Sequence, residues 1–263
     1  MLNDYLIMPE KKITFPLVVE PFQEDFKGHL SWANLGNIIL RVSSLHAEAH
    51  GFGHTYMLTH KRGWVLSRLV LELDHLPATN EPYNVTTWVS RIFRQFTDRN
   101  YAITGPDGQV YGHGASIWAL IDYETRQPVN LETLPEGGFH SAMLDETPPI
   151  APFGRARCKS TEPAATRECR YSDLDINGHV NSIRYIDMAL DLFSPEWHKA
   201  HTVKRIELAY GLEGHAGDHL ELYSDDLGPS AEGATDRRFA VEIRRPADKA
   251  TLVRVIITFA PED

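Results

Sequence analysis

The sequence predicts an α+β fold in which two long helices are each wrapped by a curved antiparallel sheet. The main observation is an internal repeat: with Gly28-His29 aligned on Gly178-His179, two halves of the chain register at an offset of 150 residues. Each half reads as a strand, a long amphipathic helix and about four further strands. A helix packed on a sheet buries the apolar face of both, which is an α+β arrangement. A period of this length indicates duplicated domains rather than a solenoid.

The first predicted domain covers residues 1–134. Residues 13–19 are expected to form a strand, where Pro16 would suit an edge position. Apolar residues at helical spacing then predict a helix over residues 31–49, with Ser31 as its N-cap. The strands expected after this helix are 64–73, 83–94, 97–104 and 109–122.

Residues 135–163 are predicted to be the linker, because prolines and glycines are concentrated there. The second domain, 164–263, is expected to begin with a strand near 165–172. A helix starting near His179 and carrying apolar residues to Phe193 follows. The last strands are expected near 203–210, 218–224, 236–245 and 250–259.

The composition is that of a soluble globular protein, with 42% hydrophobic and 24% charged residues. A net charge of −10 argues against a general nucleic-acid or membrane-surface binder. No run approaches a transmembrane helix and no targeting segment is evident, so we expect a cytoplasmic location. Cys158 and Cys169 lie eleven residues apart, which suggests reduced thiols rather than a disulfide scaffold or a zinc module.

The densest polar stretch of the chain precedes the second helix. Asp173, Asp175, Asn177 and His179 are spaced by two, so in an extended run their side chains would point the same way. Gly178 would let the backbone pass close to another group. A helix beginning near His179 would leave free N–H groups, which suit a carbonyl oxygen that becomes negative. This stretch is therefore a candidate active site.

The first copy of the repeat has a less complete set of these groups. Asp25 and His29 correspond to Asp175 and His179, but Lys27 stands where the second copy has Asn177. We therefore expect the active site to use mainly second-half residues, with the first half closing the pocket.

Other catalytic patterns fit poorly. The chain has no Gly-x-Ser-x-Gly elbow and no glycine-rich phosphate loop. His46 and His50 are four apart on the first helix, but the intervening glutamate is one residue later than zincins require, so we expect packed or solvated histidines and no metal. Hydrolysis by carboxylate, carboxamide and imidazole groups remains, and it needs a base. Glu213, in a turn between two strands, is the candidate, although composition alone would favour a solvent-facing acid.

The string Asp173-Leu-Asp-Ile-Asn-Gly-His-Val-Asn181, followed by Tyr185, closely resembles the signature of acyl-ACP thioesterases, a family of plant plastid enzymes with bacterial relatives. Stretches of the first half, including Trp64-Val-Leu-Ser-Arg68 and residues 116–129, look like the bacterial branch. The resemblance implies a tandem pair of hotdog domains. It also implies hydrolysis of the thioester between a fatty acyl chain and acyl carrier protein (ACP), which terminates chain growth in fatty acid biosynthesis without a cofactor.

The resemblance also implies the site residues: Asp175, Asn177, His179 and Glu213 match the positions of the family's active-site groups. In the expected mechanism Glu213 activates a water molecule. Asn177 and His179, with nearby backbone N–H groups, hold the thioester and its oxyanion, and Asp175 orients them. Plant members carry a cysteine after the glutamate, whereas this chain has Gly214, so we do not expect a thiol nucleophile.

Two alternatives remain: an acyl-CoA thioesterase of the same fold, and a non-catalytic acyl-binding double hotdog. ACP is strongly acidic, so its docking needs a local basic patch, for which the candidates are Lys204-Arg205, Arg91 and Arg94. An apolar acyl pocket is expected in the first half, against the 31–49 helix. A homodimer of the tandem is compatible with this interpretation. The aromatic residues that could line the pocket, depending on strand register, are Trp64, Trp88, Phe93, Phe96 and Trp118.

Overall fold

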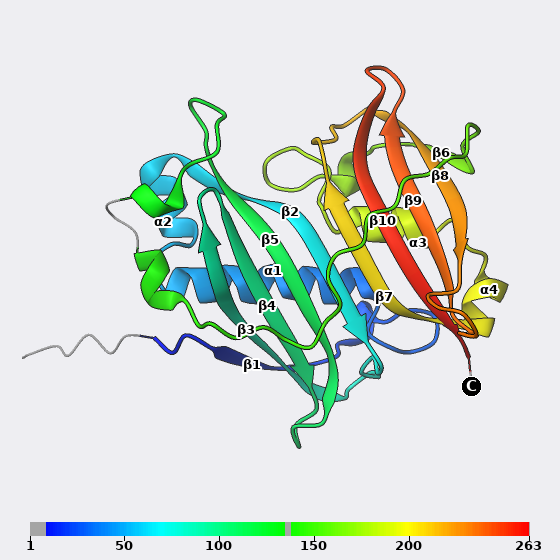
Figure 1. Ribbon diagram of the computed structural model, residues 1–263, viewed down its shortest axis with the longest axis horizontal. Coiled ribbons are helices and arrows are strands. Elements are labelled where there is room, and N and C mark those ends of the chain that lie inside the picture. The colour runs from blue at the N-terminus through cyan, green and yellow to red at the C-terminus, as the bar shows by residue number, and fades with distance from the viewer. Residues whose placement is uncertain (1–8, 135–137, 263) are drawn as a thin grey trace, which may run out of the picture.

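The computed structural model describes residues 9–134 and 138–262. In the first half, β1 is followed by a long helix α1, a short helix α2 and four strands (Figure 1). Their bounds are β1 Ile13–Val18, α1 Trp32–Ala49, α2 His54–His60, β2 Arg62–Leu73, β3 Pro82–Phe93, β4 Phe96–Thr104 and β5 Val110–Asp122.

The second half repeats this order of elements. Its bounds are β6 Ala165–Glu168, α3 Arg184–Leu190, α4 Pro195–Ala200, β7 His201–Tyr210, β8 His219–Gly228, β9 Arg237–Arg245 and β10 Ala250–Pro261. The duplication expected from the sequence is therefore present as strand, helix and four strands in each half.

All ten strands form one antiparallel sheet in the order β1-β3-β4-β5-β2-β7-β10-β9-β8-β6. The two halves have the same strand order running outward from the centre, where β2 pairs with β7 from Arg68–Ala209 to Glu72–Arg205. The helices α1 and α3 lie behind the sheet in the view of Figure 1. β1 is an edge strand, and this position accommodates Pro16 as expected.

Helix α1 matches its prediction closely. The Ser31 hydroxyl accepts a hydrogen bond from the Asn34 N–H and caps the helix. Leu35, Ile39 and Val42 recur at helical spacing and are fully buried in the main core. The helix ends where Gly51 adopts a positive φ of 79°. This 18-residue helix is the central buried element of the first half.

The second helix is shorter than predicted and begins at Arg184 rather than near His179. The Val180 N–H donates to the Gly214 carbonyl and the Asn181 N–H to the Asp173 carbonyl, so both residues belong to extended pairings. Helical bonding starts only where Arg184 donates to Asn181. Beyond α3, aromatic rings occupy the space under the sheet. The pairs with centroids less than 6 Å apart include Phe193 with Phe239, Phe193 with Phe259, and Trp197 with Phe239.

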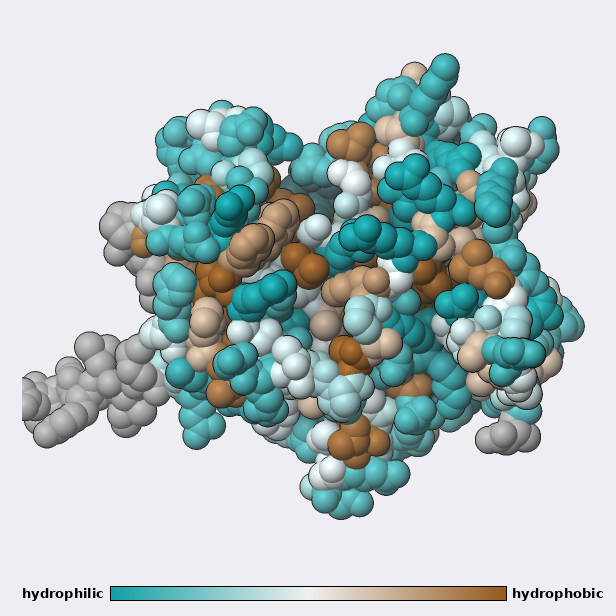
Figure 2. All heavy atoms as spheres, viewed as in Figure 1, coloured by the Kyte–Doolittle hydropathy of each residue, from teal (hydrophilic) through white to brown (hydrophobic). Residues whose placement is uncertain are grey.

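The segment predicted as linker packs on both halves. Phe139, in a short 3-10 helix, is buried beside Phe52 and Tyr56 of the first half. Residues 151–160 then cross the outer face of the second half of the sheet, the side opposite the helices (Figure 1). Hydrophilic side chains cover most of this outer face, with separate hydrophobic patches between them (Figure 2). Among the described residues, no helix is long and apolar enough to cross a membrane.

The two histidines of α1 are packed rather than arranged for metal binding. The Nε2 atom of His46 lies 3.1 Å from the Lys11 carbonyl oxygen, and the His46 ring stacks on His50 with centroids 4.2 Å apart. Burial, and next the charge of Arg99, lower the pKa of His46 to about 3. His46 is therefore a neutral core residue at physiological pH.

Candidate active site

The polar stretch forms a tight turn rather than an extended run. One carboxylate oxygen of Asp175 accepts hydrogen bonds from the backbone N–H groups of Asn177 (2.8 Å) and His179 (3.3 Å). Gly178 has a φ of 76°, in the left-handed region that glycine adopts readily. The two-residue spacing therefore does not point the polar side chains in one direction, and that expectation was wrong. Asp175 orients the backbone of its own turn.

Asp173 has a structural role. Its carboxylate is buried, and both oxygens lie 2.8 Å from the Nη2 atom of Arg167. It also accepts the backbone N–H of Arg170. These bonds satisfy the buried charge and fix the entry to the turn.

The expected backbone oxyanion site is not formed at this turn. The N–H groups of Asn177 and His179 donate to the Asp175 carboxylate, and that of Gly178 donates to the Asp175 carbonyl. The next two N–H groups bond to Gly214 and Asp173, as described above. The side-chain donors at this turn are the exposed Asn177 carboxamide and the half-buried His179 ring.

Glu213 lies beside His179, more than thirty residues away in sequence. Its Oε1 is 3.5 Å from Nδ1 of His179, and an isolated antiparallel bridge between His179 and His215 holds the two loops together. Glu213 Oε2 accepts a hydrogen bond from Arg126 at 3.1 Å. A contact of 3.5 Å is long for a hydrogen bond, and catalytic contacts of this kind often tighten in the substrate complex. The structure thus brings together a carboxylate, an imidazole and a guanidinium.

Arg126 and His215 complete this cluster, and sequence reasoning did not find them. Arg126 comes from the turn after β5, so the first half contributes directly to the second half's site. Arg126 is far from Glu213 in the sequence, so no local sequence pattern connects the two residues. The His215 ring meets His179 edge-on, with centroids 5.0 Å apart. Its position two residues after Glu213 could have suggested it.

The same cluster includes possible metal ligands. One ligand atom each from His179, Glu213 and His215 lies within 4.8 Å of the other two. Two histidines and a glutamate are a known zinc ligand set. The guanidinium of Arg126 already engages the carboxylate, however, and would repel a cation at this point.

Arg245 fixes the loop that carries Glu213. Its Nη1 donates to the backbone carbonyl of Glu213 at 3.1 Å and to the Asp218 carboxylate at 2.7 Å. Asp218 in turn accepts the backbone N–H of His215. Burial opposes ionisation of Asp218, but the hydrogen bonds and charge of Arg245 outweigh it and hold the pKa below its usual value. Arg245 is thus a positioning residue of the site.

Tight packing around Gly214 explains why the residue after Glu213 is a glycine. A Cβ atom there would lie 2.7 Å from the Tyr185 hydroxyl and 3.0 Å from a methyl group of Val180. The two cysteines do not replace a nucleophile, because burial raises the pKa of Cys158 and of Cys169 to about 11. Both thiols are protonated at neutral pH.

A cavity of about 90 Å³ lies where the acyl pocket was expected, between α1, α2 and the first half of the sheet. Trp64 and Trp118 line it, whereas Trp88 is buried elsewhere and Phe93 and Phe96 are exposed. The cavity is less apolar than expected, because the fully buried guanidinium of Arg99 also lines it. Arg99 donates to Thr87 at 3.2 Å.

A larger cleft, of about 590 Å³, lies at the other copy of the turn. Its lining includes Asp25, Lys27 and His29, and Lys27 forms a 2.6 Å ion pair with Glu262 across it. The more open space is thus beside the copy that lacks a counterpart of Glu213.

The fold and the cluster define the class of protein. A tandem of two domains, each with a helix packed on an antiparallel sheet, is a double hotdog. Models of the acyl-ACP thioesterase N-terminal and C-terminal domains match residues 13–133 and 159–260, and the chain belongs to the acyl-ACP thioesterase family.

Individual relatives agree with this assignment. The crystal structure of an acyl-ACP thioesterase from Bacteroides thetaiotaomicron is 39% identical, with a TM-score of 0.85 over 95% of this chain and 98% of that chain. The 12:0-ACP thioesterase of Umbellularia californica is 17% identical with a TM-score of 0.80, covering 96% and 95% of the two chains, and it supports the fold.

Curated plant proteins are more distant. The chloroplastic acyl-[acyl-carrier-protein] hydrolase FATB2 of Cuphea viscosissima is 24% identical over 88% of this chain and 55% of its own length. The chain spans about half the length of the first curated relatives it matches.

Proposed function

We propose that this protein hydrolyses fatty acyl-ACP thioesters to free fatty acid and ACP. Family membership supports the reaction class. The observation that carries the proposal is the approach of Glu213 to His179 within 3.5 Å, next to a turn that presents the Asn177 carboxamide. A base, an imidazole and an amide donor are the groups that water attack on a thioester needs.

In the proposed mechanism Glu213 takes a proton from a water molecule, and that water attacks the thioester carbonyl. The Asn177 carboxamide and the His179 ring donate hydrogen bonds to the developing oxyanion, since the N–H groups of Asn177, Gly178 and His179 are already used within the turn. Arg126 and the backbone contact from Arg245 hold Glu213 in place. Collapse of the tetrahedral intermediate breaks the C–S bond, and the proton held by Glu213 passes to the departing sulfur, which leaves as the pantetheine thiol of ACP.

The cavity beside α1 is the proposed site for the far end of the acyl chain. Its lining by Trp64, Met57 and Leu40 supports an apolar ligand. Its small volume and the nearby Arg99 favour short over long chains.

The test is hydrolysis across a series of saturated acyl-ACPs of increasing length, with matched acyl-CoAs in parallel. Release of free thiol is followed with a thiol reagent. We expect turnover of acyl-ACP at low enzyme concentration and weaker turnover of acyl-CoA. Binding of acyl-ACP without thiol release would contradict the proposal and indicate an acyl-binding protein. Faster turnover of acyl-CoA than of acyl-ACP would indicate CoA as the preferred carrier, and the reaction would still be thioester hydrolysis.

Two further expectations accompany this proposal. A cytoplasmic location stays a prediction, and the names of the plant relatives state that those proteins are chloroplastic. A homodimer also stays a prediction, which light scattering of the purified protein would test.

A further inference from the structure

A groove of about 490 Å³ crosses the outer face of the sheet where the two halves join. Four arginines line it: Arg68 from β2, Arg155 and Arg157 from the linker, and Arg254 from β10. Among the described residues that line it, Glu207 is the one acid, and Arg205 already pairs with it at 2.9 Å. A protein with a net charge of −10 thus concentrates positive charge in one place.

Three of these charges are available to a partner. Arg155 and Arg157 are exposed, and within the described part of the chain neither has an ion-pair or hydrogen-bond partner. The Arg68 guanidinium lies over the Phe153 ring, 5.8 Å from its centroid, also without an acidic partner in the described ranges. Arg254, in contrast, contacts Glu242 at 3.1 Å. Unpaired arginines in a groove suit carboxylates or phosphates.

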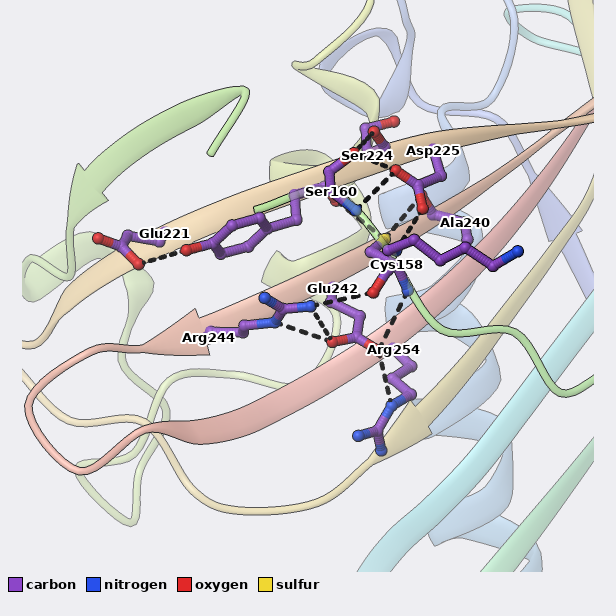
Figure 3. A network of polar contacts seen from close by, with 11 residues as sticks. Cys158, Ser160, Glu221, Ser224, Asp225, Ala240, Glu242, Arg244 and Arg254 are labelled. Carbon is purple, nitrogen blue, oxygen red and sulfur yellow. Dashed lines mark hydrogen bonds and ion pairs between the residues drawn. The ribbon is translucent and has the colours of Figure 1, made fainter. Parts of the chain in front are cut away.

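The linker that carries two of the arginines is held in a fixed position. Figure 3 shows its end at Cys158 and Ser160 bonded to Glu242 and Asp225 of the second half. Upstream, the Gly154 N–H donates to Glu207 at 2.5 Å.

Arg205 has a supporting role here. Its Nη2 donates to the carbonyl oxygens of Ala151 (2.9 Å) and Pro152 (3.1 Å). The predicted docking role of Arg205 was therefore wrong, because its side chain is buried and bonds the linker to the sheet. The arginines of the groove are thus held on a rigid base, which lowers the entropy lost when a partner binds.

The groove also lies close to the candidate active site. Ala209 lines the groove, and Glu213 is four residues further along the same strand and turn. Four residues span at most about 14 Å of chain. A carrier bound in the groove would therefore hold its flexible arm within reach of the end of the sheet where Glu213 and His179 meet.

We propose that this groove docks the acidic surface of the carrier protein, with Arg155, Arg157 and Arg68 as the main contacts. The inference rests on the proposed function, because it assumes an acyl group delivered by an acidic carrier. Charge complementarity of this kind accelerates and orients association more than it adds affinity.

The test compares a carrier-bound with a carrier-free substrate. Wild type and the double variant Arg155→Glu/Arg157→Glu are assayed with an acyl-ACP and with the same acyl group on pantetheine. We expect the ratio of the two kcat/KM values to fall by about tenfold or more in the variant, mainly through KM for acyl-ACP. The control is Lys11→Glu/Lys199→Glu, the same charge change at two exposed positions outside the groove, for which the ratio should stay constant.

Equal losses on both substrates, or an equal change in the control, would overturn the proposal. The milder variant Arg155→Gln/Arg157→Gln covers the case in which the reversed charges disturb folding, and its ratio should fall in the same direction. Direct binding of ACP, measured by fluorescence anisotropy at two salt concentrations, separates docking from chemistry. Absence of hydrolysis with salt-sensitive ACP binding would refute the proposed function but support the docking site. Hydrolysis of acyl-ACP with no effect of the arginine variants would support the proposed function but refute the docking site.

Discussion

The turns at residues 25–29 and 175–179 have the same backbone and different chemical equipment. In each, an aspartate accepts the N–H groups two and four residues later, and the third residue after it is a glycine with φ near 80°. In each turn, the N–H of the residue after the histidine donates to a carbonyl of a neighbouring loop: Leu30 donates to Pro77, and Val180 donates to Gly214.

The differences lie in the neighbouring loop. His29 bridges to Ala78, and His179 bridges to His215. Two residues earlier in each loop, the first copy has Leu76 and the second has Glu213. The paired loop therefore supplies a carboxylate beside the imidazole in the second copy, whereas the carboxylate near His29, that of Glu262, comes from the end of β10 and is paired with Lys27. The aspartate and glycine of the signature thus form the same turn in both copies, and we infer that the proposed catalytic capacity depends on the residues brought to that turn.

Replacing the histidine of each turn should give the largest difference in activity between the two copies. We expect His179→Ala to lower kcat by about 100-fold or more, because it removes an oxyanion donor beside Glu213. The matched variant His29→Ala should leave kcat within about twofold, because the loop paired with its turn has Leu76 where the second copy has Glu213. Steady-state hydrolysis of acyl-ACP measures both. Equal losses in the two variants would show that both copies serve the reaction.

A smaller loss is expected when Glu213 keeps its side chain but loses its support. Arg245→Gln removes the bond to the Glu213 carbonyl, and misplacement of a base can reduce kcat by about 10- to 100-fold. KM should change little, and Arg245→Lys should recover part of the rate. Asp248→Asn is the control, since it removes another partner of Arg245 without touching Glu213. A loss confined to KM would rule out the positioning role.

A substitution at Gly214 should lower stability through a steric clash without removing a group that takes part in the proposed reaction. Gly214→Ala places a methyl group against the Tyr185 hydroxyl and should lower the free energy of unfolding by about 1–3 kcal/mol. The Tyr185 hydroxyl is buried without a hydrogen-bond partner among the described residues. Adding Tyr185→Phe should therefore restore much of the stability, as urea denaturation would show. No recovery in the double variant would place the cost elsewhere.

The smallest effect on activity is expected at α1, where a substitution should change only the dependence of stability on pH. His46 has a folded-state pKa of about 3, below its unfolded value of 6.5, so acid protonates the unfolded chain first. Its contribution to stability is thus present above pH 6.5 and is lost as the pH falls toward 3. We expect His46→Gln to reduce the slope of unfolding free energy against pH in this window by up to about 1.4 kcal/mol per pH unit. Unchanged slopes would contradict the buried neutral state.

The fold was largely predictable because its signals are local and repeated. Apolar spacing and the Ser31 cap predicted α1, and the repeat predicted the tandem. The start of α3 was not predictable, because Val180 and Asn181 are held by bonds to Gly214 and Asp173, which lie in other elements.

The candidate site was predictable only in part. The signature and the resemblance pointed to His179 and Glu213, which the structure brings together. Arg126 reaches the site from the turn after β5 and Arg245 from the end of β9, and their partners depend on tertiary packing. The roles of the individual backbone N–H groups depend on how the turn closes, which residue spacing does not reveal.

The proposed mechanism depends on Glu213 of the second copy as the base that activates the attacking water. The most direct test is single-turnover hydrolysis of an acyl-ACP by Glu213→Gln, with ACP binding measured in parallel. We predict that the rate falls by about 100-fold or more while binding stays within about twofold. A rate within about threefold of wild type, with binding unchanged, would contradict the assignment of Glu213 as the base.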